Sequence, residues 1–326
     1  MESYTKTNVS KFDAKKLFDE SGIGVAENIR EVEAGEFNTI FQIRSGDKRY
    51  FMKFGSSPEV KVLSYEKDIL NTEIYFYNKL EGSAVKRPAV VFTDSTRTKI
   101  GVDYFIMEAL NTPLLGYTFP STNQRKRFSY QLGANLAELH KITTEEGFGY
   151  PQCGLEETWE DAYKKMINNL IADATVLDVK LDTFRINNIL TYATPYLKEV
   201  TAPSLVHFDV WVGNIFVSKT HNFQGLIDWE RAMWGDPVGD FISLNLFKKF
   251  ENNEYLIKGY NSVTPFEITE NVLIRANLLR MYLGMIMVVE PCTRWKKGSL
   301  IYFARRRIGK RLFNRAINAL EKQLKE

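Results

Sequence analysis

Cysteine is scarce in this sequence. The 326 residues include two cysteines, Cys153 and Cys292, which lie far apart and form no Cys-x-x-Cys pair. This spacing argues against a structural zinc site and against a disulfide framework, and it favours a reducing compartment. The amino-terminal residues are polar and lack the apolar core of a signal peptide. We therefore expect a cytoplasmic protein.

A large net charge and a long hydrophobic run are lacking as well. The net charge is only +3, which gives no general case for binding to nucleic acid or to a membrane. The longest uncharged apolar run, residues 281–289, is too short to cross a bilayer. Hydrophobic residues make up 44% of the chain and charged residues 25%, as in globular proteins with an ample core. We expect no nucleic-acid partner and no membrane partner, and no pattern sets the oligomeric state.

One stretch, residues 206–230, contains the clearest chemical pattern. Two short apolar runs in it, 215–217 and 223–227, are separated by a polar segment and predict a β-hairpin. Asn214 enters the first strand and Asp228 leaves the second, so pairing about the middle of the polar loop would place the two side by side. Oxygen ligands of this kind suit Mg²⁺. Asp209, just outside the hairpin, would then be free to orient an attacking hydroxyl.

Each of these polar residues has an ordinary alternative reading, because Asp and Asn favour turns and helix caps. Their joint spacing, Asp-x-x-x-x-Asn followed by a second Asp, instead favours phosphoryl transfer. In that chemistry Asp209 is the catalytic base or orienter, and Asn214 and Asp228 bind the metal. We expect His207, which precedes this pattern, to be buried and to hold the backbone rather than to carry a proton.

A second motif, Trp-Gly-Asp-Pro-Val-Gly-Asp-Phe at residues 234–241, follows closely and leaves no room for a long activation segment. Together with His-x-Asp-x-x-x-x-Asn at 207–214 and Ile-Asp-Trp at 227–229, it resembles the aminoglycoside phosphotransferase and choline kinase family of small-molecule kinases. The resemblance implies transfer of the γ-phosphoryl group of ATP, or of GTP, to a hydroxyl of a small molecule. Phe208 departs from the family pattern, which has glycine there. The aspartates of 234–241 are expected to be structural caps.

The first hundred residues predict a small antiparallel sheet with one helix. The expected strands are residues 29–32, 39–44, 48–54, 90–93 and 102–107. Lys53 lies among apolar neighbours in the third strand, and a buried ammonium needs a partner. Glu66 and Glu73 lie on one face of a helix expected over residues 57–80. The resemblance favours Glu73, and it implies that the ion pair places Lys53 on the nucleotide phosphates.

The resemblance also implies the rest of the nucleotide site. Gly35, between the first two strands, would cover the phosphates, and the alternative reading is a plain hairpin turn. The adenine edge would bond to backbone groups near Glu108 and Leu110, with Met107 behind the base, or Met107 is simply core. The expected fold class is α+β: a bilobal protein-kinase-like fold with an N-terminal antiparallel five-stranded sheet plus helix and a mostly helical C-terminal lobe. The pattern changes after residue 108, which predicts a nucleotide-binding lobe over 1–108 and a catalytic and substrate-binding lobe over 109–326.

The acceptor is less well defined. The acidic stretch 154–182 could form a cleft for a polycationic acceptor, or it could be the solvated face of amphipathic helices. An aminoglycoside or amino-sugar-like acceptor is favoured. The basic segment 294–326 has an apolar stripe typical of a docked terminal helix, although membrane or nucleic-acid binding would use the same charges. The alternative function is a non-catalytic nucleotide-binding or docking module on a kinase-like fold.

Overall fold

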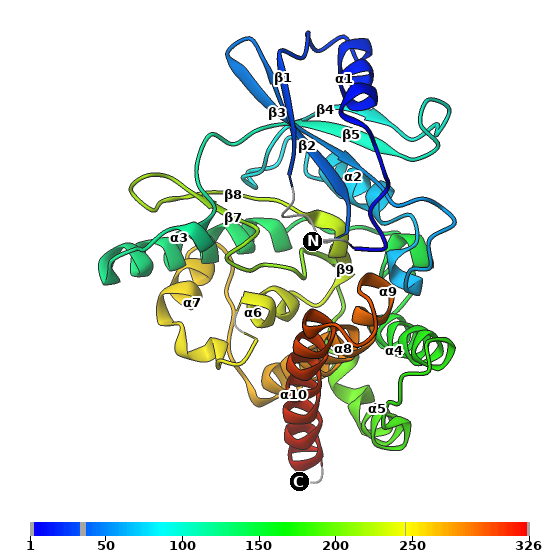
Figure 1. Cartoon of the computed structure of the whole chain (residues 1–326). Helices are drawn as coiled ribbons and strands as arrows, with labels where there is room; N and C mark the ends of the chain where they lie inside the picture. The colour runs from blue at the N-terminus through cyan, green and yellow to red at the C-terminus, as the bar shows by residue number, and fades with distance from the viewer. Residues whose placement is uncertain (1–2, 33–36, 245, 325–326) are drawn as a thin grey trace.

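The computed structural model describes residues 3–32, 37–244 and 246–324. An antiparallel sheet of five strands lies at one end of the molecule, and helices fill the other end (Figure 1). The strand order is β1-β2-β3-β5-β4. The strands are β1 (Asn28–Glu31), β2 (Thr39–Ser45), β3 (Lys48–Phe54), β4 (Val90–Asp94) and β5 (Tyr104–Glu108). The five-stranded sheet predicted from the alternating apolar residues is confirmed.

Each face of this sheet is covered by one helix. Helix α1 (Lys11–Glu20) buries Phe18 in a small core with the side chains of alternate strand residues such as Phe41 and Met52. Helix α2 (Ile69–Lys79) packs on the other face, where Phe105 joins the main core of the protein. Because successive residues of a strand point to opposite faces, Lys53 shares the α2 side of the sheet.

The helix before β4 is shorter than the sequence predicts. Residues 57–63 are not helical, η1 (Ser64–Glu66) is a single 3₁₀ turn, and α2 begins at Ile69. Asp68 has a left-handed backbone (φ 50°), which separates the turn from the helix. Glu66 therefore lies outside α2, and its carboxylate accepts a hydrogen bond from the Leu63 N–H at 2.9 Å.

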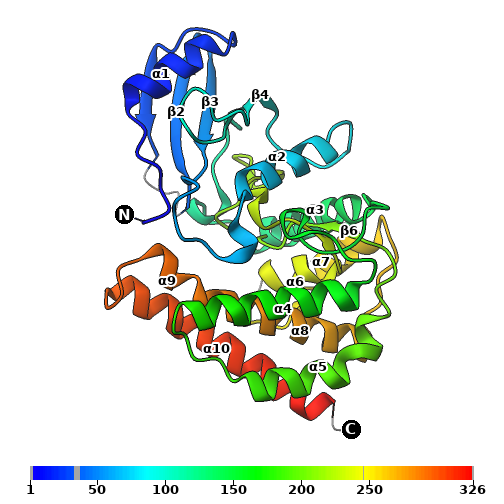
Figure 2. The same ribbon diagram turned by 90° about the vertical axis from the view of Figure 1, so that its right-hand side faces the viewer.

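The remainder of the chain is mostly helical. Its helices are α3 (Thr122–His140), α4 (Trp159–Val176), α5 (Thr183–Leu197), α6 (Val238–Leu244), α7 (Glu254–Asn261), α8 (Glu270–Val289), α9 (Pro291–Arg294) and α10 (Leu300–Gln323). Further 3₁₀ turns are η2 (Leu115–Tyr117), η3 (Pro151–Cys153), η4 (Trp229–Arg231) and η5 (Phe250–Asn252). Helix α8 lies in the centre, with α4, α5 and α10 beside it (Figure 2).

Helices α8 and α10 have unusual compositions, one apolar and one basic, and the structure shows where each of them lies. Residues 270–294 are long and apolar enough to cross a membrane, but 72% of the apolar window is buried inside the protein, as in the core helix of a globular fold. Helix α10 buries Leu312, Phe313 and Ile317 against the main core and leaves its basic residues outside. The docked terminal helix predicted from its apolar stripe is confirmed.

Two short strand pairs lie between the sheet and the helices. Strand β6 (Ser204–Val206) pairs with β9 (Met233–Gly235), and β7 (Ile215–Val217) pairs with β8 (Phe223–Leu226). The β7–β8 hairpin was predicted, but its register differs by one residue, since the Ile227 N–H donates to the Asn214 carbonyl at 3.1 Å. An irregularity between Phe216 and Val217 shifts the pairing. Asn214 is thus opposite Ile227 and not opposite Asp228.

Candidate active site

Lys53, Glu73 and Asp228 converge between the sheet and the β7–β8 hairpin. The Lys53 Nζ lies 2.6 Å from Oε2 of Glu73 and 2.7 Å from Oδ1 of Asp228. The lysine side chain is only 4% exposed. Burial alone would lower the pKa of Lys53, but the carboxylates of Asp228 and Glu73 raise it well above its usual range. The ion pair between Lys53 and Glu73 expected from the sequence is present, and the lysine carries its charge.

The backbone fixes the direction of the Asp228 side chain. Asp228 follows β8 in a left-handed conformation (φ 69°), which costs free energy for a residue other than glycine. The next N–H, that of Trp229, donates to Oε1 of Glu73 at 3.3 Å. Glu73 thereby holds both Lys53 and the turn after Asp228, which ties helix α2 to the end of the hairpin.

His207 and Asp240 hold the loop that precedes the hairpin. The ring Nε2–H of His207 donates to the carbonyl oxygen of Ile227 at 3.0 Å, while Nδ1 accepts from the Asp209 N–H at 3.3 Å. The Asp240 carboxylate accepts from the N–H groups of His207 (3.1 Å) and Phe208 (2.7 Å). His207 is therefore a buried residue that pins the backbone, as expected, and Asp240 is a structural cap.

Asp209 and Asn214 share a hydrogen bond across the loop. The Asn214 Nδ2 donates to Oδ2 of Asp209 at 2.9 Å, and the Asp209 side chain is 23% exposed. Its other oxygen, Oδ1, accepts no hydrogen bond from any described residue. Burial raises the pKa of Asp209, and the nearby guanidinium of Arg231 opposes this rise. A partly exposed carboxylate with one oxygen that accepts no hydrogen bond is suited to accept a proton or a hydrogen bond from a hydroxyl.

Phe208 occupies a position that favours glycine. Its backbone is left-handed (φ 59°), which is strained for a side chain with a Cβ. The ring is fully buried, 6.0 Å from the ring of Tyr282, and Gly239 leaves room for it, since a Cβ there would come within 3.0 Å of the Phe208 ring. Phe208 therefore lacks the backbone freedom of glycine, but its buried ring adds packing to the core.

Glu230 is a buried member of the site that the sequence analysis missed. Its Oε2 lies 3.5 Å from the Lys53 Nζ and accepts a hydrogen bond from the Asn38 Nδ2 at 3.0 Å. Burial, together with the charge of Asp228, raises the pKa of Glu230 to about 8. The signal was present in the sequence, because Glu230 follows Asp228 by two residues in Asp-Trp-Glu.

Carboxylate oxygens of Glu73, Asp228 and Glu230 lie within 4.8 Å of one another, close enough to hold a metal ion. Among the described residues, the ion pairs of these three carboxylates and of Asp209 are made with Lys53 and Arg231. The donors are hard oxygens, and bound Mg²⁺ would favour the ionised form of the carboxylates, so the residues fit Mg²⁺. The amide oxygen of Asn214 accepts no hydrogen bond from any described residue and is free to join them.

The segment after β5 contains the residues expected at the adenine. The Glu108 N–H is already engaged with the Ala89 carbonyl at 2.8 Å, and the Glu108 carboxylate pairs with Lys48 at 2.8 Å. The Leu110 N–H has no hydrogen-bond acceptor within the described part of the chain. Met107 is buried, with its sulfur 3.8 Å from the Tyr77 hydroxyl. Gly35 lies outside the described residues.

Comparisons with known proteins agree on one family. The model of the "Phosphotransferase enzyme family" matches residues 28–255. The chain is 25% identical over 245 residues to a "Probable ketoamine kinase" of Vibrio vulnificus (strain CMCP6), covering 72% of this chain and 77% of the relative. A protein of the same description from Vibrio parahaemolyticus is 24% identical over 259 residues, covering 74% and 79%.

Solved structures show the same architecture. A protein named as a fructosamine-3-kinase from Thermobifida fusca superposes with a TM-score of 0.70 at 17% identity, covering 96% of this chain and 98% of that one. A spectinomycin phosphotransferase in complex with ADP and spectinomycin gives a TM-score of 0.59 at 12% identity, covering 97% and 99%. The expected fold class, a protein-kinase-like fold with an antiparallel sheet and a mostly helical remainder, is confirmed.

Proposed function

The chain belongs to the phosphotransferase enzyme family, and on that premise we propose that it moves the γ-phosphoryl group of ATP to a hydroxyl of a small, amino-sugar-like molecule. The observation that carries the proposal is the meeting of Lys53, Glu73 and Asp228 beside Asp209. A buried lysine that faces several carboxylates, next to a partly exposed aspartate, has the charges that a bound triphosphate and its acceptor require. This complete set argues against a non-catalytic binding module.

Asp209 is proposed as the residue that meets the acceptor. Its free Oδ1 would accept the hydrogen bond of the incoming hydroxyl and hold the oxygen in line with the phosphoryl group. Asn214 fixes the other oxygen of the same carboxylate, which restricts its rotation. The pair thereby orients the nucleophile before transfer.

Asn214 and Asp228 are proposed to hold Mg²⁺, with Glu230 as an additional oxygen donor. When bound, Mg²⁺ would supply positive charge that neutralises the phosphates. Lys53 would share Asp228 with the metal and place its ammonium on the nucleotide phosphates, while Glu73 keeps the lysine aligned. Lys53 and Mg²⁺ would both bring positive charge to the phosphates. The reaction would form no covalent bond to the protein.

The nucleotide is proposed to lie against the segment after β5. The free N–H of Leu110 supports a hydrogen bond to the adenine edge near Glu108, and buried Met107 supports an apolar contact behind the base. Gly35 remains a proposal for the cover over the phosphates. ATP is the favoured donor and GTP the alternative.

The end of β5 at Glu108 supports a lobe boundary between residues 108 and 109. The two free cysteines support a cytoplasmic location.

A ketoamine, or another sugar linked to an amine, is the acceptor class that the named relatives favour. The acidic stretch 154–182 contributes little to this choice, because several of its acids have other partners: Glu156 pairs with Lys165, Glu160 with Lys164, and Asp173 accepts from the Ser64 N–H. These pairs favour the reading in which the stretch is a helix surface. The acceptor proposal therefore rests on the relatives.

ADP release tests the proposal directly. The purified protein would be incubated with ATP and Mg²⁺ and with a panel that includes a fructose–lysine ketoamine, free amino sugars and aminoglycosides. We expect acceptor-dependent ADP release with at least one ketoamine, and release that is slower by a factor of about 100 or more from the Asp209→Asn variant. ADP release that is equal in the two proteins, with every acceptor, would refute the proposal.

A further inference from the structure

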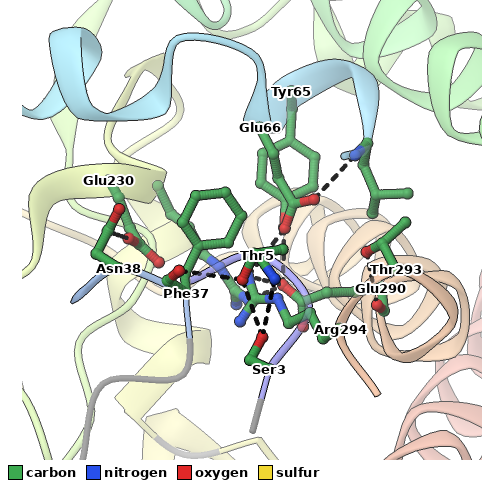
Figure 3. Close-up of polar contacts among 12 residues, drawn as sticks. Ser3, Thr5, Phe37, Asn38, Tyr65, Glu66, Glu230, Glu290, Thr293 and Arg294 are labelled. Atoms are coloured by element: carbon green, nitrogen blue, oxygen red, sulfur yellow. Dashed lines mark hydrogen bonds and ion pairs between the residues drawn. The ribbon is translucent and has the colours of Figure 1, made fainter. Parts of the chain in front are cut away.

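A buried charged junction lies where helix α8 ends. Oε1 of Glu290 accepts hydrogen bonds from Nη2 of Arg231 at 2.5 Å and from the Tyr65 hydroxyl at 3.0 Å, and it lies 2.6 Å from Nη2 of Arg294. Figure 3 shows Glu290 beside Tyr65 and Arg294. The Glu290 side chain is only 8% exposed. Buried charges persist only when they are paired in this way. The junction therefore joins the carboxyl end of α8 to the turn that follows Asp228.

Arg231 stands between this junction and the reacting carboxylate. Its Nη1 is 3.6 Å from Oδ1 of Asp209, while its Nη2 makes the short bond to Glu290. A distance of 3.6 Å is too long for a hydrogen bond. An arginine and a carboxylate at this distance attract each other, and their preferred arrangement is a direct, bidentate pair. Glu290 competes with Asp209 for the same guanidinium.

We propose that Glu290 is a positioning residue for Asp209 and that it acts through Arg231. By holding the guanidinium on the α8 side, Glu290 keeps Oδ1 of Asp209 free to accept the hydrogen bond of the acceptor hydroxyl. The inference rests on the proposed function of Asp209. Glu290 lies outside the segment 28–255 that matches the family, so the role belongs to the carboxyl-terminal part of this chain.

Arg294 does not need Glu290 as its counter-charge. Arg294 has a second carboxylate, Glu66, whose Oε1 accepts from its Nη2 at 2.9 Å, and its guanidinium also lies 5.1 Å from the ring centre of Phe37 (Figure 3). Glu66 is fully buried and makes no hydrogen bond or ion pair with Arg231. One carboxylate therefore suffices for Arg294, and the charge of Glu290 is available to hold Arg231 away from Asp209.

Removing the two partners separately and together tests the role. Glu290→Gln keeps the shape but weakens the hold on Arg231, so we expect kcat with a fructose–lysine ketoamine to fall roughly 10- to 100-fold, as for a misplaced reacting group, with the KM for ATP unchanged. With Arg231→Gln there is no guanidinium left to restrain. The double variant Arg231→Gln/Glu290→Gln should then match Arg231→Gln in kcat.

Three results would overturn the proposal. They are a wild-type kcat in Glu290→Gln, a double variant about 10-fold or more below Arg231→Gln, and an Arg231–Asp209 distance that stays near 3.6 Å in a crystal structure of Glu290→Gln. We expect that distance to shorten to about 2.8 Å. If Glu290→Gln does not fold, the double variant, which loses one charge of each sign, still decides the outcome.

Matched controls distinguish a failure of the role proposed for Glu290 from a failure of the proposed phosphotransferase function. Glu66→Gln alters the same junction without touching Arg231, so it should lower the stability but leave kcat unchanged. Calorimetry of the wild-type protein with ATP and Mg²⁺ reports on nucleotide binding alone. A wild-type protein that phosphorylates no acceptor would refute the proposed function, and the Arg231–Asp209 distance in Glu290→Gln would still decide whether Glu290 holds Arg231 back.

Discussion

The ammonium of Lys53 lies 2.7 Å from Oδ1 of Asp228, although the two residues are 175 positions apart in the chain. Lys53 belongs to β3 of the sheet, and Asp228 follows the β7–β8 hairpin. Their contact joins the sheet to the hairpin. Glu73 and Glu230 also pair with the same ammonium. A phosphotransferase needs this meeting, because phosphate-binding and metal-binding groups must face one nucleotide.

Asp228→Asn should abolish the Mg²⁺-dependent part of nucleotide binding. The amide keeps the size of the side chain but removes the negative charge that is proposed to hold the metal. Calorimetric titration of ATP with and without Mg²⁺ measures the difference, and the exposed turn variant Asp47→Asn serves as the control. Equal Mg²⁺ dependence in Asp228→Asn and in the wild-type protein would remove Asp228 from the metal site.

Asp209→Asn should lower kcat by roughly 10^2- to 10^4-fold, as expected for the loss of a general base. Nucleotide affinity should stay the same, because the proposed phosphate contacts come from Lys53 and the metal ligands. Steady-state kinetics on the best acceptor and calorimetry with ATP separate these two effects. An unchanged kcat would show that Asp209 neither accepts the proton nor orients the hydroxyl.

Stability of the metal-free protein should fall as the pH rises from about 5 to about 8. Burial raises the pKa of Glu230 from 4.5 to about 8, so the folded protein keeps a proton that the unfolded chain releases. The stabilisation is complete below the unfolded pKa and is lost as the pH passes through the folded one. One proton contributes at most about 1.4 kcal/mol per pH unit.

Urea unfolding in a chelating buffer across this range measures the slope. Glu230→Gln should reduce the slope, because the amide has no proton to lose and still accepts the hydrogen bond from Asn38. The pKa values of Glu73 and Asp209 are also raised, so part of the slope should remain. A slope that is identical in the variant would contradict the raised pKa of Glu230.

The part of the fold that follows local patterns could be predicted from the sequence. Strands β1 to β5 appear within one or two residues of their expected limits, because each is a short run rich in apolar and β-branched or aromatic residues with turn residues beside it. That Lys53 meets a carboxylate was predictable, since a buried ammonium needs a partner, and the family resemblance favoured Glu73 over Glu66. The start of α2 was wrong because Asp68 adopts a left-handed backbone that no pattern in the sequence required.

Contacts that depend on tertiary packing could not be predicted in this way. Glu290 and Arg294 lie in a segment without a motif, and they reach Arg231 and Glu66 only because α8 ends beside η1. His140, at the end of α3, likewise bonds to the buried side chain of Asp240 at 2.9 Å. These partners depend on where whole helices dock, and local periodicity in the sequence does not predict that docking.

Phe208 allows a test in which the smaller residue is the more stable one. Phe208→Ala loses the buried ring and keeps the strained left-handed backbone, so it should destabilise the protein by about 3 to 5 kcal/mol. Phe208→Gly loses the same ring but relieves about 1 kcal/mol of backbone strain. We expect the glycine variant to be the more stable of the two in chemical denaturation. The opposite order would show that the φ of 59° is not strained.

The amino-terminal strap, residues 3–7, should matter for nucleotide binding although it lies outside the family match. The Thr5 hydroxyl donates to the Phe37 carbonyl at 3.0 Å, and the Tyr4 N–H donates to the Arg294 carbonyl at 3.0 Å. Phe37 is two positions after Gly35, so the strap anchors one end of the segment proposed to cover the phosphates. Thr5→Val removes the donor and leaves a buried carbonyl unpaired, which should cost about 1 to 3 kcal/mol of stability.

We expect the same variant to raise the KM for ATP with little change in kcat, because Asp209 and Asn214 keep their contact. Thr98→Val, at an exposed position, is the matched control. Initial rates across a range of ATP concentrations, measured well below the unfolding temperature of both variants, distinguish the two roles of the strap. A loss of stability without a change in the KM for ATP would mean that the strap braces the sheet and that the segment around Gly35 works independently of it.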